Sequence, residues 1–155
     1  MTVAQGLRWR IGHGLVTFAL LSSPAIAQSA APIIDKPFAE HYLALQLSDN
    51  DPKKEALTIS VAYNLLKYYG PDRIAIEVVT FGPGIDLLRA SNAHRAEVDS
   101  LVSQGVQFDI CMNTVETIER ETGKPVDINP HAVKVAAGVA QILALTEKGF
   151  TLVRP

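Results

Sequence analysis

The chain has 155 residues, of which 48% are hydrophobic, and a formal net charge of −2. This length suits one domain with its own core. A slightly acidic chain lacks the basic surface that nucleic acid or an anionic membrane requires, so we expect neither as a partner.

The first 27 residues have the pattern of a secretory signal peptide. Arg8 and Arg10 precede an apolar run at 15–21, and Ala25-Ile26-Ala27 forms a cleavage site of the A-x-A type. The run is too short for a membrane span of about 20 residues, and an uncleaved anchor is the alternative. We expect cleavage after Ala27, a periplasmic location, no membrane attachment after cleavage, and a formal net charge of −4, because the leader holds two basic residues and no acidic one.

After the leader, the pattern predicts a tail over 28–37 and one α/β domain over 38–155. The predicted elements follow in chain order: strand 42–47, helix from Pro52 to the stop at Gly70, strand 73–80, helix 93–104, strand 106–110, helix 112–122, strand 133–136, helix 139–148 and strand 150–153. Their alternation predicts a flavodoxin-like three-layer sandwich with a mainly parallel five-stranded sheet.

Two of the predicted helices carry recognisable signals at their starts. Asp51 is expected to cap the first helix, in which an apolar stripe recurs one turn apart. This stripe consists of Leu57, Val61, Leu65 and Tyr68. Asn113 and Glu116 have the spacing of a capping box in the helix over 112–122.

Cys111 is the single cysteine of the chain. It cannot form an intramolecular disulfide, so the domain depends on its core. The residue stands between the third predicted strand and the following helix, where unpaired amides and the positive helix end favour a thiolate. A thiolate attacks sulfane sulfur or a disulfide. The alternative is a structural cysteine, because free cysteines are often buried.

Three segments are expected at the carboxyl ends of the strands, where the sites of such sheets gather. They contain the candidate site residues, which are Asp49 and Asn50, Gly82 and Gly84, and Asn113 and Thr114 beside Cys111. The Gly82-Pro83-Gly84 segment could offer amides to an anion, although a tight turn explains it more simply. Capping already explains Asp51.

Other kinds of site lack their sequence signals. His41, His94 and His131 have no metal-binding spacing, so we expect no metal. The chain has no G-x-G-x-x-G motif and no P-loop lysine, so we expect no cofactor. It has no G-x-S-x-G motif from which a hydrolase triad could start.

Taken in order, several short motifs resemble those of the DsrE/DsrF-like family of small sulfur-relay proteins, particularly its leader-bearing branch. These motifs are Ser48-Asp49-Asn50-Asp51-Pro52, Phe81-Gly82-Pro83-Gly84, Gly105-Val106 with Phe108, Cys111-Met112-Asn113-Thr114, Ala137-Gly138-Val139 and 149–155. The resemblance implies a flavodoxin-like fold, assembly into homotrimers or homohexamers, and a persulfide-carrying cysteine at the position of Cys111. Ile85, Leu87 and Leu88 are candidates for the subunit contact.

Two functions follow as hypotheses. In the first, Cys111 accepts sulfur from a sulfane-sulfur donor, holds it as a persulfide and passes it to an acceptor thiol protein. Asn113 and Thr114 then supply hydrogen-bond donors, while Asp49 and the turn from Gly82 to Gly84 shape the mouth. In the second, the protein is a non-catalytic oligomeric module that binds a small molecule or a protein, and Cys111 is structural.

Overall fold

The computed structural model describes residues 35–155. The predicted signal peptide, its cleavage site and most of the predicted tail lie outside these residues. Of the tail, residues 35–37 are described. The Lys36 ammonium donates hydrogen bonds to the carbonyls of Pro71 (2.8 Å) and Ile74 (3.1 Å), which fixes this residue beside the start of the second strand.

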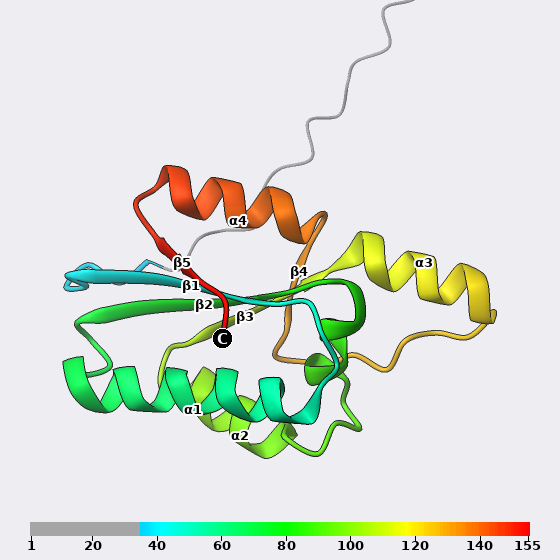
Figure 1. Ribbon diagram of the computed structural model, residues 1–155, viewed down its shortest axis with the longest axis horizontal. Helices are drawn as coiled ribbons and strands as arrows, with labels where there is room; N and C mark the ends of the chain where they lie inside the picture. Colours follow the sequence, from blue (N-terminus) through cyan, green and yellow to red (C-terminus); the bar gives the residue numbers. More distant parts are fainter. Residues whose placement is uncertain (1–34) are drawn as a thin grey trace, which may run out of the picture.

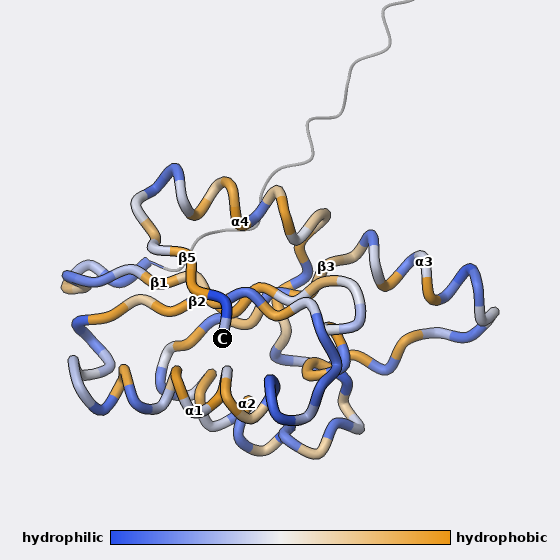
Figure 2. Tube along the Cα trace, in the orientation of Figure 1, coloured by the Kyte–Doolittle hydropathy of each residue, from blue (hydrophilic) through white to orange (hydrophobic). Residues whose placement is uncertain are grey.

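A five-stranded sheet with all strands parallel forms the centre of the described domain (Figure 1), which confirms the predicted α/β class. Its order is β4-β3-β2-β1-β5. The strands are β1 (His41–Leu47), β2 (Ile74–Thr80), β3 (Gln107–Cys111), β4 (Val133–Val135) and β5 (Thr151–Val153). Figure 2 shows hydrophobic residues gathered along the central strands, as expected for strands covered on both faces.

The helices make the outer layers of the sandwich. They are α1 (Pro52–Tyr69), the short 3-10 helix η1 (Gly82–Leu88), α2 (Arg95–Ser103), α3 (Met112–Thr122) and α4 (Gly138–Glu147). Both α1 and α2 cover one face of the sheet, whereas α4 lies on the other (Figure 1). This follows from right-handed crossovers, because the connection through α4 returns to β5 at the opposite edge of the sheet.

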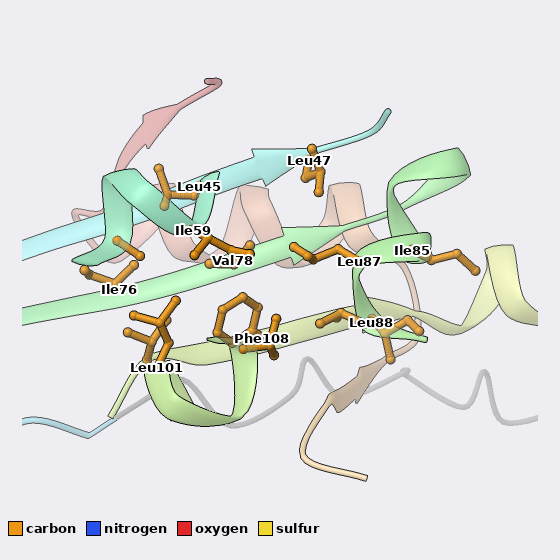
Figure 3. Close-up of a cluster of buried hydrophobic side chains, with 14 of the residues drawn as sticks. Leu45, Leu47, Ile59, Ile76, Val78, Ile85, Leu87, Leu88, Leu101 and Phe108 are labelled. Carbon is orange, nitrogen blue, oxygen red and sulfur yellow. The ribbon is translucent and has the colours of Figure 1, made fainter. Parts of the chain in front are cut away.

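The larger core lies between the sheet and the layer of α1, α2 and η1 (Figure 3). Leu45, Ile76 and Phe108 come from neighbouring strands and are almost fully buried there. Ile85, Leu87 and Leu88 of η1 complete this core and are also buried. The prediction that these three residues form a subunit contact is therefore wrong, because their side chains are buried within the protomer and cannot contact another subunit.

Helix α1 has the predicted bounds and cap, since the Asp51 carboxylate accepts a hydrogen bond from the Lys53 amide at 2.9 Å. Its buried face matches the predicted stripe only in part: Val61 and Leu65 are half-buried against the core, whereas Leu57 and Tyr68 are 47% and 79% exposed. The buried residues are Glu55, Thr58, Ile59, Ala62 and Leu66. Apolar residues form two adjacent stripes along the helix. The sheet covers the stripe that also contains the polar residues Glu55 and Thr58.

Helix α3 begins two residues earlier than a capping box on Asn113 and Glu116 requires. Cys111 occupies the N-cap position, so Asn113 lies inside the first turn and the predicted capping box does not form. Val115 is the only side chain of α3 that is buried. The helix extends beyond the carboxyl ends of the strands and lies beside η1 (Figure 1).

Candidate functional site

Three segments that are distant in sequence meet around Cys111 at the carboxyl edge of the sheet. The Asn113 amide donates to the Ala136 carbonyl at 3.2 Å, which ties α3 to the connection between β4 and α4. A Cβ atom at Gly138 would lie 3.0 Å from the Cβ atom of Phe81, so the start of α4 packs closely on the end of β2. The site is therefore bounded by the residues that follow β2, β3 and β4.

Cys111 itself is the last residue of β3 and the N-cap residue of α3. It pairs in register with Val135 of β4 and is only 5% exposed. Side chains alternate along a strand, so Cys111 lies on the same face of the sheet as Asp109. That is the face covered by α4, because Gln141 of α4 interacts with the Asp109 carboxyl. The predicted position at a helix N-terminus is thus confirmed, but the thiol is buried on the face of the sheet where α4 lies.

Two of the other predicted site residues are in direct contact. The Thr114 hydroxyl accepts a hydrogen bond from the Gly82 amide at 3.0 Å, which joins the start of α3 to the start of η1. Gly82, Asn113 and Thr114 also line one groove of about 440 Å³, together with Pro83, Thr117 and Ile118. Cys111 does not line this groove.

Gly84 serves close packing and does not offer an accessible amide to an anion. It is buried, and a Cβ atom there would lie 2.3 Å from the Leu47 carbonyl oxygen. Only glycine lets η1 approach the end of β1 this closely. This contact supports the structural interpretation of the Gly-Pro-Gly segment.

Asp49 and Asn50 follow β1 and do not line the groove beside α3. The Asp49 carboxylate forms an ion pair with the Lys54 ammonium at 2.7 Å, and both side chains are more than two-fifths exposed. Asn50 is exposed. The structure therefore brings together Gly82, Asn113 and Thr114 from the predicted set, but not the two residues after β1.

A buried polar cluster beneath α4 was missed by the sequence analysis. Glu77 of β2 and Asp109 of β3 are completely buried, and Gln141 of α4 is almost completely buried. The Gln141 amide donates to Glu77 at 3.3 Å, and the Gln107 amide donates to Asp109 at 2.9 Å. Burial, followed by the charge of Glu77, raises the pKa of Asp109 to about 8. The sequence signal that could have revealed this cluster is a charged residue in the middle of an apolar strand, such as Glu77 in β2.

A second buried carboxyl group, that of Glu55, lies at the start of α1. The Asn92 amide donates to it at 3.3 Å and also donates to the Asp86 carbonyl at 2.9 Å. Burial raises the pKa of Glu55, and the Asn92 hydrogen bond partly opposes this effect. Asn92 therefore joins α1 to η1 through a polar contact that a pattern of apolar residues could not predict.

Residues 35–155 contain neither a recognisable metal site nor a helix that could span a membrane. Within this part of the chain, no three His, Cys, Asp or Glu residues are arranged to hold a metal ion. None of its helices is both long and apolar enough to cross a bilayer.

The chain is similar to a protein whose structure has been solved. The solved structure of the protein of unknown function MTH1491 from Methanobacterium thermoautotrophicum is similar, with a TM-score of 0.67 and 27% sequence identity. The similarity covers 75% of this chain and 100% of that one. The two chains share a flavodoxin-like fold. No protein-family model and no curated protein matches the chain significantly.

Proposed function

We propose that the protein is a periplasmic sulfur carrier that holds sulfane sulfur as a persulfide on Cys111. The observation that carries the proposal is the position of this single cysteine, at the carboxyl end of β3 and at the N-cap of α3. The positive end of a helix favours the thiolate, which is the nucleophilic form of cysteine. The resemblance to the DsrE/DsrF-like family supports this proposal, and the similarity to MTH1491 supports the fold alone.

The proposed chemistry needs no cofactor. The Cys111 thiolate attacks the terminal sulfur of a polysulfide, the S–S bond behind that sulfur breaks, and a polysulfide shorter by one atom leaves with the electron pair. The thiolate of an acceptor protein then attacks the outer sulfur of the persulfide, and the Cys111 thiolate is the leaving group. Because Cys111 is buried and does not line the groove formed by Gly82, Asn113 and Thr114, donor and acceptor would reach the thiol only when its cover opens.

The experiment is mass spectrometry of protein purified without oxygen from its native host. We expect a mass increase of one sulfur atom that is removed by excess reductant and regained on incubation with polysulfide. The Cys111→Ser variant should fold and show no added sulfur. The Asp49→Asn variant is a matched control, because its exposed carboxylate lies in an ion pair away from the groove, and it should be loaded like the wild type. Native protein that takes up no sulfur under these conditions contradicts the proposal.

A second function, a binding module with a structural cysteine, is favoured by the burial of the thiol. Cys111 is 5% exposed, whereas the neighbouring groove is open to a ligand without it. The rate of alkylation by iodoacetamide separates the two functions. A native thiol that reacts only as fast as the protein unfolds supports the binding module, and a native thiol that reacts at a rate independent of unfolding supports the carrier.

We also propose that the protein assembles into a homotrimer or homohexamer, as the family resemblance implies. Contact surface is available on α4 and β5 instead of on η1. Val139 and Leu143 of α4 and Leu152 and Val153 of β5 are exposed large apolar residues. Sedimentation of the mature protein tests the assembly, and a monomer at micromolar concentration contradicts it.

A further inference from the structure

The two faces of the sheet are covered very unequally. On the face of α1 and α2, a large core includes bulky residues from three strands and three helices. Beneath α4 the apolar cluster is much smaller, and its residues from β1 and β2 are Ala44, Ala75 and Val79. Burying little apolar area gives little free energy, so α4 can separate from the sheet at a smaller cost than α1 can.

The remaining layer beneath α4 is occupied by polar groups that require a proton. Glu77 and Asp109 lie on neighbouring strands with no exposed surface, so two negative charges there would repel each other out of reach of water. In the same layer, the Asp109 Oδ2 and Gln141 Oε1 atoms are buried acceptors that receive no hydrogen bond. A proton on the carboxyl pair reduces the negative charge and supplies a donor.

Among the described residues, no cation is among the groups that shift the pKa of Asp109. The charged group that acts on Asp109 is Glu77. One other titratable group faces the layer, the thiol of Cys111. The remaining side chains that face it are neutral: Ala44 and Gln46 of β1, Gln107 of β3, Val133 and Val135 of β4, and Gln141 of α4. Lys134, in register with the core residue Ile110, faces the opposite side of the sheet. While α4 is in place, Asp109 is therefore neutralised by a proton.

We propose that the Glu77–Asp109 pair is a proton-dependent latch for α4, which covers Cys111 while the pair holds a proton and separates from the sheet when the pair loses it. Gln141 is the contact through which α4 engages the pair. The first turn of α4 and the connection before it lie against Phe81 and Asn113, so that their movement uncovers the end of β3. The latch is independent of sulfur chemistry and goes beyond the proposed function.

The size of the effect follows from the proton balance. A carboxyl exposed to water on opening returns to a pKa of about 4, whereas Asp109 beneath α4 has a pKa of about 8. Each opening between these values releases one proton, so the opening equilibrium should rise about tenfold per pH unit and level off above about pH 8.

Hydrogen exchange of the mature protein tests the latch directly. Protection factors of the α4 amides, corrected for intrinsic exchange, are measured at several pH values from about 5.5 to about 8.5, where the change is expected. We expect α4 protection to fall about tenfold per pH unit and to stay below that of the best-protected α1 amides at every pH. Protection of α4 that does not change with pH, or that equals α1 protection throughout, overturns the proposal.

Four variants identify the titrating group. Asp109→Asn should remove the pH dependence of α4 protection, and Glu77→Gln should reduce it. Two variants are used because either one still tests the proposal if the other fails to fold. Glu147→Gln removes an exposed carboxylate of α4 and should behave as the wild type. Cys111→Ala should keep the wild-type response, and loss of the response in this variant overturns the assignment to the carboxyl pair.

Accessibility of the thiol tests the covering of Cys111 separately. At about pH 8, where the wild-type pair has lost part of its proton, a thiol reagent should modify wild-type Cys111 faster than Cys111 in Asp109→Asn. Equal rates, or a faster reaction in the variant, overturn the statement that α4 covers Cys111.

Discussion

Replacing Asp109 by asparagine removes a titratable group from the layer beneath α4 with little change in shape. The amide oxygen of asparagine can still accept the hydrogen bond from Gln107, and its NH₂ group supplies the donor that this layer lacks. The substitution therefore isolates the energetic effect of protonation on the stability of the whole domain.

The magnitude follows from the pKa values of the two states. Burial and the charge of Glu77 raise the pKa of Asp109 to about 8 in the folded protein, and an aspartate in an unfolded chain has a pKa of about 3.9. Between these values the folded protein holds a proton that the unfolded chain has released, so the free energy of unfolding falls as the pH rises. One proton corresponds to about 1.4 kcal/mol per pH unit, or roughly 3 kcal/mol between pH 5 and pH 7.

The assay is urea unfolding of the wild type and of Asp109→Asn at each pH across this range, followed by circular dichroism. Subtracting the two free energies cancels every group that titrates alike in both proteins. We expect the stability of the variant relative to the wild type to increase with pH at about 1.4 kcal/mol per unit. A difference that does not change with pH refutes the assignment of a retained proton to this carboxyl.

Three further predictions test local packing by equilibrium unfolding. Gly84→Ala should cost about 3 kcal/mol or more, because the new Cβ atom would meet the Leu47 carbonyl oxygen, and a smaller loss would show that η1 can move away from β1. Asp51→Ala should cost about 1 kcal/mol by removing the N-cap of α1, and Asp51→Asn should retain most of the stability. Ile59→Ala should cost about 3 kcal/mol, whereas Leu57→Ala should cost less than about 0.5 kcal/mol; equal losses would contradict the burial of Ile59 and the exposure of Leu57.

Much of the fold could be predicted because its signals are local. Asp51 and Pro52 mark the start of α1, and Gly70 and Gly123 occupy the C-cap positions of α1 and α3. Alternation of apolar strands with such helices leaves few arrangements other than a parallel sheet. The order β4-β3-β2-β1-β5 then places residues that follow β2 and β3 at one edge, where Gly82 and Thr114 are in contact.

The errors arose where burial is decided by contacts between distant segments. The buried face of α1 includes Glu55, whose Oε2 atom accepts a hydrogen bond from Asn92, and Thr58, whose hydroxyl donates to the Lys54 carbonyl. Composition alone favoured the bulkier stripe beside it. The burial of Cys111 likewise depends on distant segments, since it pairs with Val135 of β4, and no residue near Cys111 in the sequence indicates this.

The burial of Cys111 sets opposite requirements for the two proposed functions, and α4 decides between them. A carrier cysteine must meet a donor and an acceptor, so α4 has to leave the sheet often enough for sulfur transfer. A structural cysteine in an oxidising compartment gains from a cover that stays closed, because an exposed thiol is oxidised or captured in mixed disulfides. If α4 protection falls as the pH rises and thiol reactivity increases with it, the opening of α4 gives Cys111 a route to its partners. If α4 remains closed and the thiol is inert at every pH, the groove formed by Gly82, Asn113 and Thr114 is the surface on which a ligand must be sought.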